Sequence, residues 1–189
     1  MGAQLRVYRR RIRSVKATKK ITKAMELISA SRIVKAQQRV NASSPYANEL
    51  TAAVRAVATY SNTAHPLTTA SASPKKAAIL VITADRGMAG AYSTAAIKEG
   101  DLLAASLRER GLSVETYLVG RKAISYYKFR NREIAGSWSG FSDSPTYEKA
   151  KEVSEALIAT FVDENGADEL YVICTEFKSM LTQIPVAAQ

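Results

Sequence analysis

A long stretch without glycine opens the chain and predicts one continuous helix. No glycine occurs between Ala3 and Asn62, and the only proline there is Pro45. The stretch is rich in Ala, Lys, Arg, Glu, Gln and Leu, which favour the helical conformation. Fifty residues of helix would be roughly 75 Å long, several times the usual length. Pro45 removes one backbone donor, so the helix either bends or ends there.

Apolar positions near the start of this helix have the spacing of a coiled coil. The positions, called the seam below, are Leu5, Tyr8, Ile12 and Val15. The same spacing continues into Lys19 and Thr22, whereas Ile21, Met25 and Ile28 are apolar one step out of phase. A 3-4-3 spacing is typical of helices that pair with another helix. We therefore expect a partner helix near the start of the chain and a second, mixed surface further along.

Beyond residue 62 the pattern changes to short apolar runs that alternate with helical periodicity. We expect the long basic helix to cover residues 1–62, a linker residues 63–76 and an α/β domain residues 77–189. The predicted strands are 77–84, 114–119, 134–138 and 169–175, and the predicted helices are 93–110, 121–129 and about 147–161. Such alternation is typical of a Rossmann-like, mostly parallel, doubly wound sheet. Residues 181–189 resemble the approach to a further strand, so we expect the domain to be truncated.

The positive charge of the protein is concentrated in the first forty residues. The formal net charge is +10, and the stretch up to Val40 holds twelve Lys or Arg against one acid, Glu26. A merely solvated helix usually mixes the two signs for support between neighbouring turns. This helix therefore predicts an acidic partner, either a nucleic acid or a protein surface. Between Val7 and Pro45 the only aromatic residue is Tyr8, which gives little for bases to stack on.

The sequence offers no catalytic constellation. A single cysteine, Cys174, and a single histidine, His65, exclude an internal disulfide and most metal sites or triads. A turn follows the first predicted strand, where dinucleotide-binding folds place their phosphate loop; its notable residues are Asp85, Arg86, Gly87 and Gly90. Its spacing matches neither G-x-G-x-x-G nor the P-loop, so we interpret it as a tight turn. We expect no catalytic residue, no cofactor and no metal.

Several segments resemble those of one known protein family. The similarity lies in the run Lys-Lys-Ile-Thr-Lys-Ala-Met-Glu-Leu at 19–27, Ala-Ser-Arg at 30–32, Pro-Tyr at 45–46, His-Pro at 65–66, Thr-Ala-Asp-Arg-Gly at 83–87, Gly-Arg-Lys at 120–122 and Gln-Ile-Pro at 183–185. In these residues and in their order, the chain resembles the γ subunits of F-type ATP synthases. Met88, Ala89, Ala91 and Ser93 depart from that family's usual residues at the turn.

The resemblance implies a central rotor stalk without a catalytic site of its own. The first helix would form half of an antiparallel coiled-coil axle, with a C-terminal helix as the other half. One copy per complex would contact the α and β subunits of the catalytic hexamer, the ε subunit and the c-ring, with no nucleic acid bound. Contact with the hexamer would involve Lys19, Lys20, Ile21, Lys23, Met25, Arg32 and Lys35.

The resemblance also implies a location and leaves one alternative. The protein would reach the membrane only through the complex, at the cytoplasmic face of a bacterial plasma membrane, since no transit peptide precedes the helix. The alternative is a nucleic-acid-binding protein with a basic helix and an α/β domain.

Overall fold

The computed structural model describes residues 2–60, 69, 71–163 and 165–189. The chain divides into two compact units, Met1–Thr63 and Ala64–Gln189. The predicted His65-Pro66 element lies outside the described residues.

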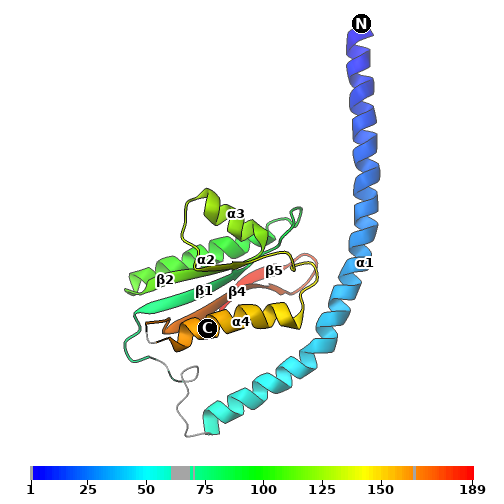
Figure 1. Cartoon of the computed structure of the whole chain (residues 1–189). Coiled ribbons are helices and arrows are strands. Elements are labelled where there is room, and N and C mark those ends of the chain that lie inside the picture. The colour runs from blue at the N-terminus through cyan, green and yellow to red at the C-terminus, as the bar shows by residue number, and fades with distance from the viewer. Residues whose placement is uncertain (1, 61–68, 70, 164) are drawn as a thin grey trace. The chain divides into compact units, whose positions relative to one another are not determined.

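The first unit is a single helix, α1, which spans Gly2–Tyr60. It continues through Pro45, and Figure 1 shows it bending between its dark blue N-terminal part and its cyan end. Proline is a common cause of such a bend, because it lacks the N–H that the preceding turn requires. Near it, the hydroxyl of Ser44 donates to the carbonyl oxygen of Val40 at 2.7 Å. Among residues 4–60 only Ile33 and Ser44 are not exposed, so α1 has no core of its own.

The second unit is built on a five-stranded sheet. Its strands are β1 (Lys76–Ile82), β2 (Ser113–Val119), β3 (Gly136–Trp138), β4 (Glu169–Phe177) and β5 (Gln183–Ala188), in the order β3-β2-β1-β4-β5. The first four are parallel, and β5 runs antiparallel to β4. The long N-terminal helix and the mostly parallel α/β sheet confirm the predicted fold class. The strand at the end of the chain is present, as a hairpin partner of β4.

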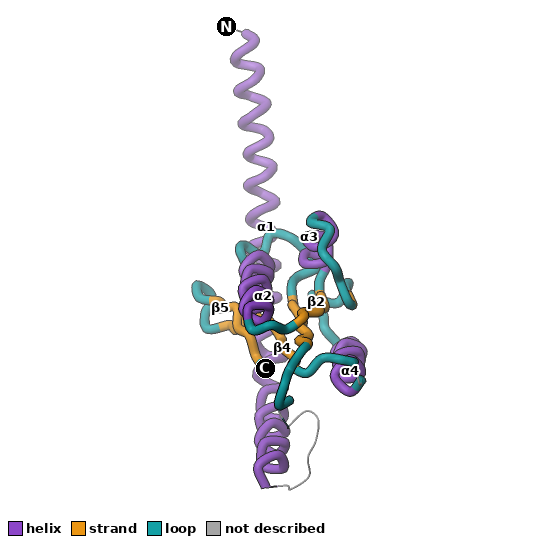
Figure 2. The backbone as a smooth tube through the Cα atoms, turned by 90° about the vertical axis from the view of Figure 1, so that its left-hand side faces the viewer, coloured by secondary structure: helices purple, strands orange, loops and turns teal. Residues whose placement is uncertain are grey.

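Helices cover both faces of the sheet. They are α2 (Tyr92–Glu109), α3 (Arg121–Phe129) and α4 (Tyr147–Val162). The strands run between α2 and α4 (Figures 1 and 2). Alternate residues of β1 point to opposite faces, so Ile79 packs in the cluster under α2 and α3, whereas Leu80 packs with Val153 and Leu157 of α4. Burial on both faces explains why residues 77–82 of β1 are all apolar.

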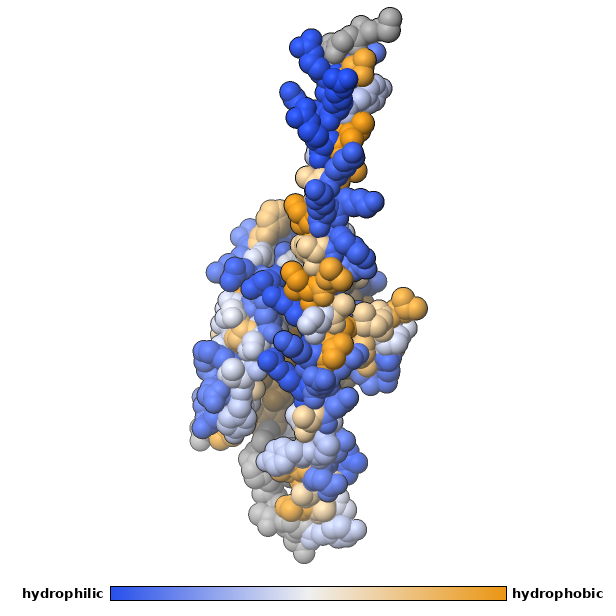
Figure 3. Space-filling view, turned by 90° about the vertical axis from the view of Figure 1, so that its right-hand side faces the viewer, coloured by the Kyte–Doolittle hydropathy of each residue, from blue (hydrophilic) through white to orange (hydrophobic). Residues whose placement is uncertain are grey.

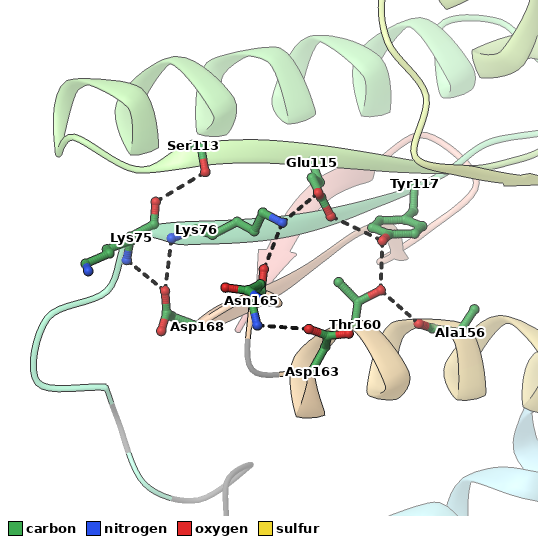
Figure 4. A network of polar contacts seen from close by, with 10 residues as sticks. All are labelled: Lys75, Lys76, Ser113, Glu115, Tyr117, Ala156, Thr160, Asp163, Asn165 and Asp168. Carbon is green, nitrogen blue, oxygen red and sulfur yellow. Dashed lines mark hydrogen bonds and ion pairs between the residues drawn. The ribbon is translucent and has the colours of Figure 1, made fainter.

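Polar contacts join the amino ends of three strands (Figure 4). One carboxylate oxygen of Asp168 accepts the backbone N–H of Lys75 at 2.7 Å and of Lys76 at 3.0 Å. These two bonds lower the pKa of the Asp168 carboxyl. The ammonium of Lys76 pairs with Glu115 of β2 at 2.9 Å. The point where the chain enters the sheet is thus fastened to β2 and β4.

The outer edge of β5 is protected by a proline. Pro185 pairs with Thr175 across the hairpin. Because proline has no N–H, this cannot be a pair that exchanges two hydrogen bonds, so the Pro185 nitrogen faces the free edge. A row of free N–H groups on an edge strand is a template for pairing with other chains. Pro185 interrupts that row.

Candidate functional surfaces of the helix and of the sheet edge

The seam of α1 is exposed in this chain. Its four apolar side chains are between 53% and 67% exposed. In Figure 3 the N-terminal part of α1, at the top, shows hydrophilic side chains on one side and a row of hydrophobic ones on the other. A helix in a protein gains most of its stability from packing such a face against another element. The seam can therefore bind a second helix.

The residues predicted to contact the hexamer do not share one face of α1. At about 100° per residue, Lys19 and Lys23 continue the line of the seam. Four others fall together on a different side of the helix: Ile21, Met25, Arg32 and Lys35. Lys20 lies between the two groups. All seven are exposed. The helix thus has a second surface beside the one that continues the seam.

A row of mostly apolar side chains with a seven-residue repeat continues along α1 well beyond the seam. It was not predicted from the sequence. Counting on from the seam with the same 3-4 spacing reaches eight positions, all apolar except Ser43: Ile33, Ala36, Val40, Ser43, Ala47, Leu50, Val54 and Val57. A strict seven-residue repeat is the pattern of a left-handed coiled coil. The 3-4 spacing could have indicated this row, but four consecutive positions of the repeat between Val15 and Ile33 hold polar residues and interrupt the apolar pattern. The surface for a second helix therefore spans nearly all of α1.

The turn after β1 is organised by the carboxylate of Asp85. One oxygen accepts the N–H of Arg121, at the start of α3, at 2.9 Å. The other accepts the N–H groups of Gly140 at 2.8 Å and Ser142 at 3.0 Å. The Asp85 N–H donates in turn to the Ser142 hydroxyl at 2.8 Å. Asp85 therefore ties together the loops that follow β1, β2 and β3.

The electrostatics of the turn follow from these bonds. Partial burial acts to raise the pKa of the Asp85 carboxyl, but the backbone N–H groups of Ser142, Gly140 and Arg121 outweigh it and lower the pKa to about 2. A carboxylate at the N-terminus of α3 also interacts favourably with the helix dipole. The N–H groups of Arg121, Gly140 and Ser142 are thus bound to a carboxylate of the chain itself.

The other residues of the turn are arranged around Asp85. Arg86 pairs with Asp143 at 2.6 Å on the surface. Gly90 has a positive φ of 56°, and the neighbouring Met88 has one of 60°. A side chain at Gly87 would meet only the end of Lys122, at 3.3 Å. The partners of Asp85 in residues 140–142 were not predicted, because nothing in the sequence links positions 55 residues apart.

Other candidate groups are structural or absent from the described residues. Cys174 is half-buried in β4 and unpaired. Within the described part of the chain, no group of three or more His, Cys, Asp or Glu side chains is placed to hold a metal ion. None of the helices described combines the length and apolar character that crossing a bilayer requires.

Known proteins similar to this chain agree with the resemblance seen in its segments. The family model described as ATP synthase matches residues 4–189. The ATP synthase gamma chain of Acidothermus cellulolyticus is 60% identical over 99% of this chain, and that of Streptomyces coelicolor is 56% identical over 98%. The chain spans 63% and 62% of the lengths of these two relatives.

Solved structures share the fold at low sequence identity. The chain superposes on the central stalk and c-ring structure of the Tetrahymena thermophila mitochondrial ATP synthase with a TM-score of 0.69 and 20% identity, covering 89% of this chain and 70% of that one. A mitochondrial ATP synthase structure from Euglena gracilis matches with a TM-score of 0.62 and 16% identity, covering 100% of this chain and 57% of that one. With a family model that matches nearly the whole chain, and with relatives this similar in sequence, the chain belongs to the ATP synthase family, among its gamma chains.

Proposed function

We propose that this chain is part of the central stalk of a proton-translocating F-type ATP synthase. It would couple rotation of the c-ring to conformational change in the catalytic hexamer. The observation that carries the proposal is a helix of 59 residues that exposes an apolar row and holds the chain's excess of basic over acidic residues. Such a helix has the length and the two surfaces that an axle between a second helix and surrounding acidic subunits needs.

The proposal includes the absence of a catalytic site in this chain. At the carboxyl edge of the sheet, the carboxylate of Asp85 binds the N–H groups of Arg121, Gly140 and Ser142, and its negative charge opposes the binding of a phosphate beside it. The chain would contribute to ATP synthesis by moving its partners and would bind no cofactor itself.

The partners follow from the family. The α and β subunits would surround α1, while the α/β domain would contact the ε subunit and the c-ring, with one copy of the chain per complex. Its place would be peripheral, at the cytoplasmic face of a bacterial plasma membrane, held there by the complex alone.

The two surfaces of α1 divide the partner contacts. The surface beside the row, with Met25 and Arg32, is proposed to slide against acidic surfaces of the hexamer. Met25 is flexible and apolar, which suits a contact that must form repeatedly. Exposed ion pairs are worth only about 0–1 kcal/mol each. Weak contacts suit a rotor, since it must leave each position as easily as it reaches it.

Association with the hexamer tests the proposal. The purified chain is mixed with α and β subunits of the same organism, and complex formation is measured by sedimentation. We expect a stable complex that the double substitution Arg32→Glu with Lys35→Glu weakens. The control is Lys98→Glu, which makes the same replacement of a basic residue by glutamate at an exposed position of α2. It should leave association intact. If the chain shows no affinity for the hexamer, the stalk proposal is wrong.

Retention on DNA distinguishes the nucleic-acid alternative. A protein that neutralises several phosphates loses affinity steeply as salt increases. We expect weak retention at low salt only. Tight retention at physiological salt, together with no complex with the hexamer, would favour the alternative.

A further inference from the structure

A block of polar residues interrupts the seven-residue row of α1. The block, called the polar layer, consists of Lys19, Thr22, Glu26 and Ser29. Apolar side chains precede it at Ile12 and Val15 and follow it at Ile33 and Ala36. The spacing does not change across the layer, so a helix that binds along the row must also lie over these four residues.

Within the layer, the helix itself supplies partners for the polar groups of Thr22 and Glu26. The Thr22 hydroxyl donates to the carbonyl oxygen of Thr18 at 3.0 Å, which leaves its methyl group to face a partner. Glu26 pairs with Lys23 at 3.0 Å. In the part of the chain that the structure describes, no carboxylate pairs with Lys19. The charge of Lys19 is the one in the row that remains for a partner to match.

The surface at this level is also hollowed. A shallow depression of about 520 Å³ is lined by Val15, Thr18, Lys19, Thr22, Lys23 and Glu26. The small threonines leave this space between the longer side chains. A side chain from a second helix can enter it and reach the ammonium of Lys19.

A charged layer within an apolar row has a specific physical consequence. On a uniformly apolar row, a second helix can shift by one heptad, about 10 Å, and still bury similar contacts. A lysine within the row makes most of these positions unfavourable, because its ammonium would lose water without gaining a partner. Only the position that places an acceptor opposite it avoids that loss.

We propose that the polar layer fixes the register of the second helix, and that this helix presents a carboxylate opposite Lys19. The identity of the second helix as the other half of the axle rests on the proposed function. The positive charge around the layer, from Lys16, Lys20 and Lys23, favours an acidic residue over a neutral acceptor. The layer lowers the affinity between the two helices but allows them only one register.

Cross-linking to designed helices tests the register. The full chain with Cys174→Ala and Ala36→Cys is mixed with synthetic five-heptad helices made for both chain directions. Each helix has leucine along its row, glutamate at the position facing Lys19, and one cysteine facing residue 36 or shifted by one heptad either way. We expect disulfide formation mainly with the unshifted helix, by about tenfold or more. Lys19→Leu, tested with helices that carry leucine in place of that glutamate, should tighten binding and yet allow all three cysteine positions to react.

Matched variants distinguish an effect of Lys19 on the register from a general effect of positive charge on binding. Lys20→Leu, next to Lys19 but outside the row, should keep the single cross-link. Replacing the glutamate of the designed helix with lysine should weaken binding about fivefold, the size of one ion pair of about 1 kcal/mol. Lys19→Glu in the chain should reverse that preference, and Lys20→Glu should not.

Three results would overturn the proposal: equal cross-linking at all positions in the unmodified chain, equal effects of the Lys19 and Lys20 substitutions, or no binding of any designed helix. Pairing of the chain with its own copy across the row, seen by sedimentation, would also overturn it. Failure of the chain to join the α and β hexamer would refute the proposed function and leave the register result intact.

Discussion

Replacing Asp85 with asparagine is expected to destabilise the α/β domain by about 2 kcal/mol at neutral pH. The carboxylate accepts three backbone N–H groups, from Arg121, Gly140 and Ser142. In Asp85→Asn one oxygen becomes an NH2 group, which faces at least one of these donors and cannot accept from it. The substitution also removes the negative charge at the start of α3.

The magnitude follows from the depressed pKa. The Asp85 pKa is about 2, against an ordinary value of 3.8. At about 1.36 kcal/mol per unit of pKa shift, this difference corresponds to a contribution of roughly 2 kcal/mol to the free energy of unfolding. A group whose folded pKa is depressed stabilises the fold fully above its unfolded pKa. The contribution of Asp85 is therefore complete above about pH 4 and is lost as the pH falls from there towards 2.

Urea unfolding monitored by Trp138 fluorescence measures this effect. Trp138 is the only tryptophan, lies in β3 and stacks on Tyr117 with ring centroids 6.3 Å apart, so α1 does not contribute to the signal. Asp143→Asn is the matched control: it breaks the exposed pair with Arg86 and should cost less than about 1 kcal/mol. The gap between Asp85→Asn and the unmodified chain should be smaller at pH 3 than at pH 7. Equal unfolding free energies for the two variants, or a gap independent of pH, would refute the reasoning.

Three further predictions concern other parts of the chain. Gly166→Ala should cost about 1–3 kcal/mol in urea unfolding, because its Cβ would overlap the carbonyl oxygen of Thr160, whereas Gly87→Ala should cost little; equal costs would contradict the packing argument. Pro185→Val should restore an N–H to the free edge of β5 and lower the concentration at which light scattering detects aggregation; an unchanged threshold would show that the edge is protected by other means. In hydrogen exchange, amides of α1 should exchange faster than those of β1, and equal protection in a monomeric chain would show that α1 is stable without a partner.

The fold could be predicted where a local pattern determines structure. The uninterrupted apolar run of β1 requires burial on both faces, and the glycine-free stretch allows one long helix. The direction of β5 could not be inferred from its apolar residues, since these fit either direction. The cue was the five-residue spacing from Phe177 to Gln183, too short for a parallel crossover.

The candidate surfaces were predictable to a smaller extent. The basic character of α1 is visible in composition alone. The separation of Lys19 from Met25 depends on the helical angle between them, which the sequence analysis did not use. The role of Asp85 depends on loops that only the folded sheet brings near, so no local pattern could have indicated it.

The bend in α1 has a geometrical consequence for the proposed rotation. A straight rod rotating about its own axis displaces nothing beside it, whereas a bent rod moves like a crank. Fifteen residues follow Pro45 in α1, which is about 22 Å of helix. A bend of about 20° would displace the end of this segment by about 8 Å from the axis of the part of α1 before Pro45. One proline would thus convert rotation into a sideways stroke comparable to the spacing between packed helices.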